Sequence, residues 1–202
     1  CTQMGDAKML SEMKPTIIVF AGPNGSGKSS ITDYVDIIPP YINADDIKKT
    51  YQCSDLEAAQ KADVWREKCI AGKNSFTFET VLSTDSKLIL LRSAKENGYF
   101  IKGFFVLTAN PKVNVLRVQS REKQGGHGVP EGKVVSRYYK SLDRIPQFVS
   151  VCDVCHIYDN SGEFAARIFK KSKNGTFCLW ENEFWSEEKI AELVGIPYPL
   201  EK

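Results

Sequence analysis

The chain has 202 residues, enough for one domain with a substantial core, and 42% of them are hydrophobic and 26% charged, as is ordinary for a soluble globular protein. The formal net charge of +2 offers little attraction for nucleic acid, and no apolar run approaches the ~18 residues that a membrane span needs. We therefore expect neither nucleic acid nor a membrane as a partner.

The first 13 residues, CTQMGDAKMLSEM, precede the first patterned segment. They contain neither the apolar stretch nor the cleavage site of a signal peptide, so we expect a cytoplasmic protein. We interpret residues 1–13 as an N-terminal extension that is disordered or foreign to the native protein.

A glycine-rich segment follows the first predicted strand. Residues 16–20, TIIVF, are β-branched and aromatic without alternation, which predicts a strand buried on both faces. The spacing of Gly22, Gly27, Lys28 and Ser29 is that of a P-loop, whose backbone N–H groups surround phosphate oxygens. Lys28 would reach the β- and γ-phosphates of ATP, and Ser29 would bind Mg²⁺. The expected nucleotide-binding residues are Gly22, Pro23, Asn24, Gly25, Ser26, Gly27, Lys28, Ser29 and Ser30. The alternative is a plain glycine-rich turn before a helix.

Strands and helices alternate along the rest of the chain. We predict strands at residues 39–43, 75–79, 99–108 and 151–159, and helices at 29–35, 44–51, 54–73, 84–98, 111–124 and 133–145. This order predicts an α/β fold of the P-loop kinase type, with three layers and a mostly parallel sheet covered by helices on both faces.

The pattern changes after residue 160. Asn174-Gly175 lies between two strand-like runs and predicts a β-hairpin, and Ser186 caps a last helix at residues 186–195. We divide the chain into a kinase-type domain at 14–170 and a C-terminal hairpin and helix at 171–202, appended to the same domain.

The six cysteines show no disulfide framework. Cys152, Cys155 and His156 match the haem-attachment string CxxCH, but they lie in an apolar, strand-like run where a haem has no room. We interpret both cysteines as core thiols.

Two predicted strands end in carboxylates, at the sheet edge where the P-loop also lies. Asp45 and Asp46 follow one strand, where they could serve chemistry or only begin a helix. Glu79 ends the aromatic run Phe76-Thr77-Phe78, and a charge there is costly unless it has a function. A kinase needs such a group to accept a proton from the substrate hydroxyl.

The loop GGHGVPEG at residues 125–132 joins two helices rich in basic residues. Glycines allow such a segment to move, and Arg121 or Arg137 could then contact phosphate and stabilise its charge. The alternative is a solvated basic face. His127 in this loop is a further candidate for contact with the substrate.

The segments AGPNGSGKSSIT, YINADD, FTFET, RVQSREKQGGHGVPEGKVVSRYYKSL and CHIYDNSG together resemble the zeta toxin family over residues 14–170. The order of the later segments makes the resemblance specific, because many families share the P-loop. It implies a P-loop kinase that uses ATP and Mg²⁺ to phosphorylate the sugar of UDP-N-acetylglucosamine. It also makes an antitoxin protein a candidate partner.

The resemblance also implies roles for single residues. The general base falls on Asp45, the substrate-binding pair on Glu79 and Thr80, and the phosphate-binding arginines on Arg121 and Arg137. Asn160 lies in the loop where such kinases hold adenine. The sequence departs from the family pattern at Asn43, which replaces an acidic residue, and in the GGHGVP loop. Because of these two departures, the family resemblance predicts the fold and the type of reaction but not the identity of the acceptor.

The sequence thus predicts an ATP-dependent phosphotransferase that acts on a hydroxyl of a small molecule. The alternatives are an NTP-binding ATPase or regulatory switch, and a toxin–antitoxin component that acts mainly through a protein partner. The sequence contains no NKxD guanine motif and no apolar run that ends in a Walker B aspartate. Both absences argue against the regulatory switch.

Overall fold

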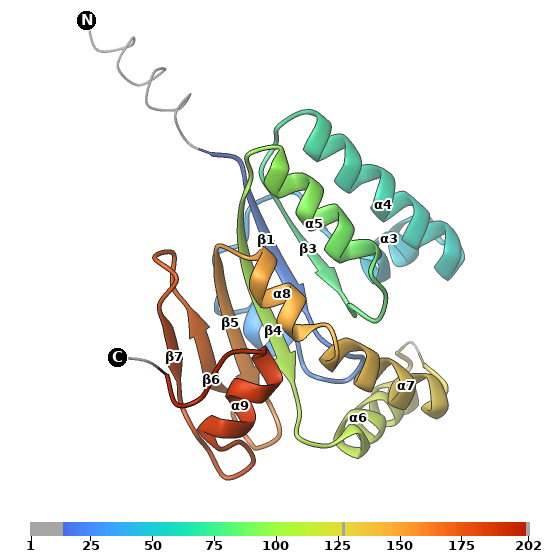
Figure 1. Ribbon diagram of the computed structural model, residues 1–202. Helices are drawn as coiled ribbons and strands as arrows, with labels where there is room; N and C mark the ends of the chain where they lie inside the picture. The colour runs from blue at the N-terminus through green and yellow to red at the C-terminus, as the bar shows by residue number, and fades with distance from the viewer. Residues whose placement is uncertain (1–13, 127, 201–202) are drawn as a thin grey trace, which may run out of the picture.

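The computed structural model describes residues 14–126 and 128–200 (Figure 1). The interpretation of residues 1–13 and the prediction for His127 lie outside the described residues. None of the described helices is long and apolar enough to cross a lipid bilayer.

A mostly parallel sheet forms the centre of the described structure. Its strands are β1 (Thr16–Ala21), β2 (Tyr41–Ile42), β3 (Phe76–Thr80), β4 (Phe100–Leu107), β5 (Val154–Asp159), β6 (Ala166–Lys171) and β7 (Phe177–Leu179), in the spatial order β2-β3-β1-β4-β5-β6-β7. The first five strands of this order pair in parallel, whereas β6 pairs antiparallel with β5, and β7 with β6. The predicted α/β fold is confirmed.

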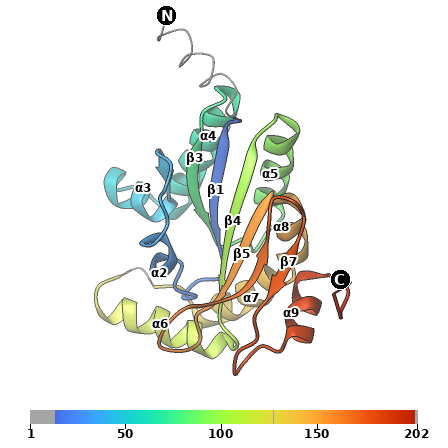
Figure 2. The ribbon, with the colours of Figure 1, turned by 90° about the vertical axis from the view of Figure 1, so that its left-hand side faces the viewer.

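The helices lie on both sides of this sheet. They are α2 (Ser29–Thr32), α3 (Ala44–Tyr51), α4 (Asp55–Ala71), α5 (Ser86–Glu96), α6 (Pro111–Lys123), α7 (Glu131–Leu142), α8 (Ile145–Val151) and α9 (Glu187–Val194). In Figure 2, α2 lies on one side of the sheet and α5, α8 and α9 on the other.

The two faces of the sheet bury very different amounts of apolar surface. The side chains of Ile17 and Val19 join a large core with residues of α4, α5, α8 and α9. Those of Ile18 and Phe20 point the other way and meet a much smaller cluster, in which Ile31 is the buried residue of α2. The unbroken apolar run of β1 is therefore buried on both faces, but the cover over one of them is thin.

Local sequence explains several helix ends. Ser54 and Glu57 form a capping box at the start of α4, and Asn110 caps α6 directly before Pro111. Gly195 ends α9 in the left-handed conformation, with φ of 72°. The hairpin predicted at Asn174-Gly175 joins β6 to β7, and the boundary that we drew at residue 170 falls within β6.

The structure differs from the prediction in two segments. The helix after the P-loop has four α-helical residues, Ser29–Thr32, rather than seven. Helix α8 was not predicted, and the strand expected from residue 151 begins at Val154. Ile145, Phe148 and Val149 recur at helical spacing and are buried, so packing onto the sheet selects a helix there.

The CxxCH segment is part of the core. Cys152 and Cys155 are fully buried, as expected for core thiols. The ring of His156 stacks on Phe104 at 5.2 Å between centroids. Burial lowers the pKa of His156 to about 4, helped by the nearby charges of Arg167, Lys102 and Lys170. Among residues 14–126 and 128–200, no three His, Cys, Asp or Glu side chains gather as a metal site would require.

The packing of α8 on β4 requires a glycine at position 103. A Cβ atom there would lie 2.5 Å from Sγ of Cys152 and 2.8 Å from Cζ of Phe148. We predict that Gly103→Ala lowers the free energy of unfolding by about 1–3 kcal/mol, because the close-packed side chains must shift. The measurement is urea denaturation.

Gly132→Ala in α7 is the matched control, because a Cβ at position 132 meets nothing within 4 Å. It should leave stability unchanged or raise it by about 0.5–1 kcal/mol. Equal stability of the two alanine variants would show that α8 does not depend on the close contact at Gly103.

Candidate functional site

The loop between β1 and α2 needs its glycines for steric reasons. Gly22 and Gly27 have φ values of 143° and 87°, which side chains rarely adopt. A Cβ at Gly22 would collide with the carbonyl oxygen of Val106, and one at Gly27 with the side-chain amide of Asn160. The glycines thereby allow the backbone to turn tightly at the carboxyl end of β1 and to pack against Val106 and Asn160.

Two asparagine side chains stabilise this loop through hydrogen bonds to its backbone carbonyl groups. Asn160 Nδ2 donates to the carbonyl oxygen of Ser26 at 2.8 Å, and Asn114 Nδ2 donates to that of Asn24 at 2.7 Å. Both asparagines are buried. The side-chain amide of Asn160 is thus engaged with the loop backbone, and the contact of Asn160 with a nucleotide stays a prediction. No local pattern singled out Asn114, because it contacts the loop only through the fold.

Lys28 lies at the centre of a bonded network. Its Nζ donates to the carbonyl oxygen of Gly22 at 2.9 Å and lies 3.4 Å from Oε1 of Glu79. The other carboxylate oxygen of Glu79 accepts from the Tyr41 hydroxyl at 2.8 Å and from Nδ2 of Asn43 at 3.3 Å. Burial and the Glu79 carboxylate raise the pKa of Tyr41, which therefore stays a donor at neutral pH. Glu79 is held on both of its oxygens.

Asn43 also determines where Asp45 and Asp46 lie in helix α3. Its Oδ1 accepts from the backbone N–H of Asp45 at 2.9 Å, so Asn43 is the N-cap of α3. Asp45 and Asp46 therefore lie in the first turn rather than at the cap. Within the described residues, the Asp45 carboxylate has neither a hydrogen bond nor an ion pair, and it lines the same cleft as Glu79.

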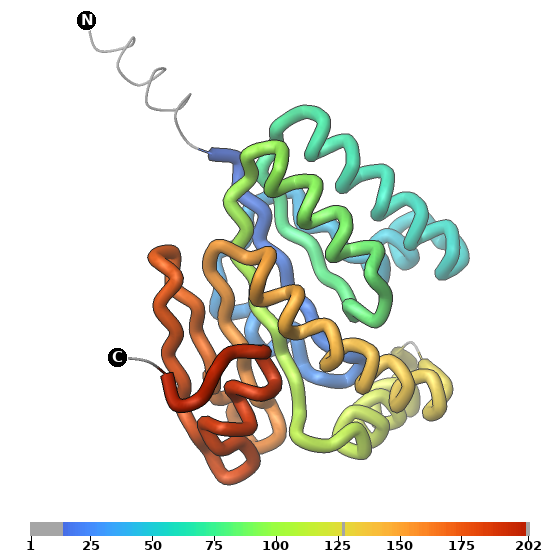
Figure 3. The backbone as a smooth tube through the Cα atoms, viewed as in Figure 1, coloured from blue at the N-terminus to red at the C-terminus, as the bar shows by residue number. Residues whose placement is uncertain are grey.

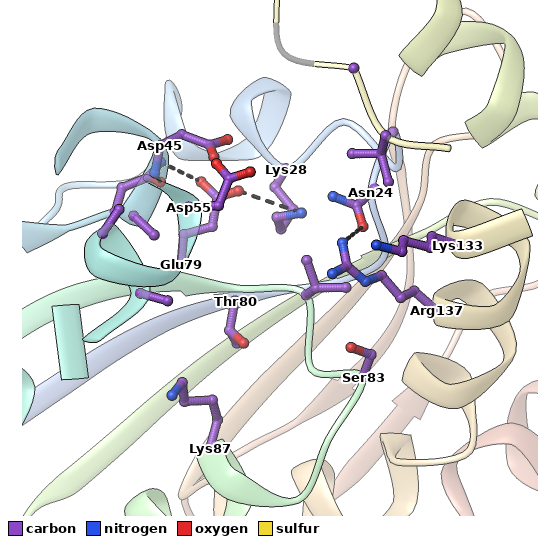
Figure 4. A pocket seen from close by; sticks show the side chains of 18 of the residues that line it. Asn24, Lys28, Asp45, Asp55, Glu79, Thr80, Ser83, Lys87, Lys133 and Arg137 are labelled. Atoms are coloured by element: carbon purple, nitrogen blue, oxygen red, sulfur yellow. Dashed lines mark hydrogen bonds and ion pairs between the residues drawn. The ribbon is translucent and has the colours of Figure 1, made fainter. Parts of the chain in front are cut away.

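Basic side chains from α6 and α7 form the opposite wall. Arg137 donates from Nη1 to Oδ1 of Asn24 at 3.2 Å, which ties α7 to the P-loop. Arg121 and Lys133 line the same cleft. In Figure 4, Lys133 and Arg137 lie across the cleft from Asp45 and Glu79. The structure therefore brings both predicted arginines to the cleft, and Arg137 contacts the P-loop directly.

A second charged group lies at the α4–α5 end of the cleft. Asp63 Oδ1 accepts from Nη2 of Arg66 at 2.7 Å and also from Nζ of Lys87. Arg66 is 3% exposed, and its guanidinium lies over the ring of Phe78 at 5.2 Å. Burial alone would raise the pKa of Asp63, but the bonds from Arg66 and Lys87 hold it below its usual value.

These groups surround one cleft of about 440 Å³. Of the predicted site residues, the structure places Asn24, Gly25, Lys28, Asp45, Glu79, Thr80, Arg121 and Arg137 on its walls. Gly22, Pro23, Ser26, Gly27, Ser29, Ser30 and Asn160 do not line it, although all but Asn160 belong to the adjoining P-loop and helix start. Sequence reasoning missed Tyr41, Asp63, Arg66, Lys87 and Lys133, whose positions follow from helix and strand packing.

The loop geometry suits a bound triphosphate with Mg²⁺. The glycines allow the loop to pack closely against Val106, Asn114 and Asn160 in a conformation with positive φ, as a phosphate-binding loop requires. Ser29, at the first position of α2, is exposed, so its hydroxyl is free to reach a cation beside the phosphates. The cleft can thus hold phosphates at one end and a second molecule between Asp45, Glu79 and the α4–α5 wall.

Comparison with known proteins gives a consistent family and fold. The family model described as Zeta toxin matches residues 2–174. An uncharacterised protein of Haemophilus influenzae (strain ATCC 51907 / DSM 11121 / KW20 / Rd) is 30% identical over 137 residues, covering 65% of this chain and 98% of that protein.

Two solved structures share the fold. A chain of the AvrRxo1-ORF1:-ORF2 complex with ATP has a TM-score of 0.70 at 14% identity, over 96% of this chain and 67% of that one. A chain from the PezAT chromosomal toxin-antitoxin system of Streptococcus pneumoniae has a TM-score of 0.56 at 17% identity, over 95% and 90%. This chain spans about two thirds of the first protein's length.

We predict that Asn160→Ala loosens the P-loop, because the Ser26 carbonyl loses its buried donor and Gly27 loses its neighbour. Amide hydrogen exchange should speed up at residues 24–30 by about tenfold or more. Asn97→Ala is the control, because Asn97 is exposed at the end of α5 and far from the loop in sequence and contacts. Unchanged exchange at residues 24–30 in Asn160→Ala would contradict the bracing role.

Proposed function

Since the chain belongs to the zeta toxin family, we propose that it is an ATP-dependent phosphotransferase that acts on a hydroxyl group of a small molecule. The observation that carries this proposal is the arrangement around Glu79. Its carboxylate contacts the P-loop lysine on one oxygen and is fixed by Tyr41 and Asn43 on the other, beside the unpaired carboxylate of Asp45. Two carboxylates at the phosphate end of the cleft can accept a proton from an acceptor hydroxyl and hold the acceptor in place.

The P-loop and Lys28 bind the triphosphate in this proposal. Lys28 Nζ now donates to the carbonyl oxygens of Gly22 and Pro23 at 2.9 and 3.4 Å, and phosphate oxygens are stronger acceptors for the same protons. Ser29 would hold Mg²⁺, which when bound neutralises charge on the phosphates. The fold of the AvrRxo1 complex with ATP supports the choice of nucleotide.

Asp45 is the proposed general base. It lies in the first turn of α3 and points into the cleft beside Glu79 (Figure 4). Because its carboxylate is unpaired within the described residues, it can accept the proton of an acceptor hydroxyl without first losing a partner. Glu79 and Thr80 would orient the acceptor, whereas Arg121 and Arg137 would balance the charge of the phosphoryl group in transfer.

UDP-N-acetylglucosamine is the proposed first candidate for the acceptor. This acceptor has to be tested directly, because Asn43 differs from the family pattern on the acceptor side of the cleft. The side-chain amide of Asn43 bonds Glu79 and caps α3, so an uncharged group stands where the family pattern has an acid. The acceptor side of the cleft is thereby less negative by one charge.

A protein partner is a second part of the proposal. The PezAT chain comes from a toxin-antitoxin system, and the AvrRxo1 chain comes from a two-protein complex. We propose an antitoxin that covers the cleft of this protein, in the cytoplasm. Co-purification of the protein with the product of a neighbouring reading frame tests it.

The decisive assay combines purified protein, ATP and Mg²⁺, with and without UDP-N-acetylglucosamine, and identifies products by mass spectrometry. We expect a species heavier by one phosphoryl group and ADP formation that depends on the acceptor. Phosphate release at the same rate with and without any acceptor would instead identify an ATPase. ATP binding without modification of this sugar nucleotide would reject this acceptor and direct the assay to other hydroxyl compounds.

Asp45→Asn should lower the turnover number by about two to four orders of magnitude and leave ATP affinity intact, because it removes only the proton acceptor. Asp46→Asn is the matched control, since Asp46 lies in the same helical turn but not on the cleft wall. If Asp45→Asn retains full turnover, Asp45 is not the base.

A further inference from the structure

One face of β5 is only half covered. The burial of its side chains alternates: Cys155 and Ile157 are buried in the large core, whereas Val154, His156 and Tyr158 on the other side are half-buried. Strands β1 and β4 are instead buried on both faces over most of their length. Parallel strands of α/β folds are normally covered on both faces, so this side of β5 lacks part of its cover among the described residues.

The side chains on this side of the sheet come from three neighbouring strands. In one cross-strand row, Phe104 of β4 lies opposite His156 of β5, which lies opposite Lys170 of β6. In the next row, Tyr158 of β5 lies opposite Arg167 of β6. Together with one lysine of β4 they form a continuous surface, which we call the open sheet face: Lys102, Phe104, His156, Tyr158, Arg167 and Lys170.

The three cations of the open sheet face have no acidic partner. Within the described residues, Lys102, Arg167 and Lys170 make neither a side-chain hydrogen bond nor an ion pair. Two of them lie over aromatic rings instead, with Nζ of Lys102 5.2 Å from the centre of the Phe104 ring and Cζ of Arg167 4.6 Å from that of Trp180. The open sheet face therefore carries three positive charges and no negative one.

The alternative is an ordinary basic surface that only water covers. Against this, the charges of all three cations act together with burial to lower the pKa of His156, so the cations converge on one ring. Lys171, next to Lys170 in β6, shows how a structural lysine behaves here: its Nζ donates to backbone carbonyl oxygens at the end of α8 at 2.8 to 3.3 Å. Like charges that converge without such contacts repel one another, and an acidic partner removes that cost.

The width and the charge of the open sheet face fit one α-helix. Neighbouring strands lie about 4.8 Å apart, so the distance from β4 to β6 is about 10 Å, close to the diameter of a helix with its side chains. A helix is also the element that covers a parallel sheet in α/β folds. Single-stranded nucleic acid fits less well, because its bases stack on open rings, whereas Phe104 is 3% exposed and lies under Lys102.

We propose that the open sheet face is the docking site for an acidic amphipathic helix of a partner protein. Carboxylates of the partner's helix pair with Lys102, Arg167 and Lys170. Its apolar side chains lie against the rings of His156 and Tyr158. None of the six residues of the open sheet face lines the cleft, so this docking site is separate from the proposed phosphotransferase site and does not depend on it.

The experiment measures binding of a synthetic helix to the full chain by fluorescence anisotropy. The probe is a labelled peptide of about 18 residues, long enough to form a helix, with glutamate along one face and leucine along the other. We expect saturable binding. The same peptide with glutamine in place of glutamate should bind about tenfold more weakly or worse, because several charge pairs are lost. A scrambled peptide of the same composition, which has no apolar face, should not saturate.

Protein variants and one NMR signal locate the binding. Arg167→Gln and Lys170→Gln should each weaken binding of the glutamate peptide about threefold to fivefold, because each removes one charge pair. Lys68→Gln is the matched control, since Lys68 is exposed on α4, and it should leave the affinity unchanged. A nitroxide on the peptide should broaden the ring signals of His156, which are simple to assign because the chain has two histidines.

The proposal fails if the glutamate peptide does not saturate, if the scrambled peptide binds equally well, or if Arg167→Gln and Lys170→Gln bind the glutamate peptide as the wild-type protein does. Unchanged ring signals of His156 would place the peptide elsewhere and also overturn it. A short single-stranded RNA that binds more tightly than the glutamate peptide would identify a nucleic-acid surface instead. None of these results bears on phosphoryl transfer, which is tested by product formation and Asp45→Asn.

Discussion

The parallel pairing of β1 with β3 is the constraint on which the site depends. In this register Phe20 lies opposite Glu79 and Ala21 opposite Thr80, so both strands end at the same level. The chain leaving β1 must form the P-loop there, and the chain leaving β3 must carry Glu79 to the same edge. The contact between Lys28 and Glu79 follows from this pairing rather than from any nearness in sequence. A slip of one residue would turn the Glu79 side chain to the other face of the sheet.

Charge is distributed along the cleft in a way that complements this geometry. Acidic groups gather at the start of α3 and the end of β3; Lys28 and the basic side chains of α7 lie on one side of them, and Lys87 of α5 lies apart from these cations. The carboxylate of Glu79 offsets the charge of Lys28, and Asp63 offsets part of the charge on α4 and α5. The cleft therefore carries both signs of charge along its walls, with the acidic side chains facing the basic ones of α7 (Figure 4).

The sequence was most informative where chemistry requires one residue type in one place. The P-loop spacing fixed the position of Lys28, and the carboxylate at the end of an aromatic run located Glu79. It was least informative for contacts made through tertiary packing. Asn160 and Asn114 reach the P-loop from residues 134 and 90 positions away in the chain, and no periodicity could predict this.

Helix α8 was missed for a related reason. Its sequence is rich in β-branched and aromatic residues and favours a strand, but Gly103 on β4 leaves room for Phe148 to pack as part of a helix. Figure 3 shows the chain passing from α6 and α7 into α8, which lies against one face of the sheet before β5 begins.

The thin cover over one face of the sheet links binding to folding. Helix α2 begins directly after Lys28 and contributes a single buried side chain, Ile31, to the small cluster on that face. Tyr34, which follows α2, is 89% exposed. The segment has few apolar contacts, and we therefore expect it to open locally at a low free energy in the free protein. A ligand that orders the P-loop also orders the start of this segment. Occupancy of the cleft would then raise the free energy of local unfolding on the face of the sheet that α2 covers.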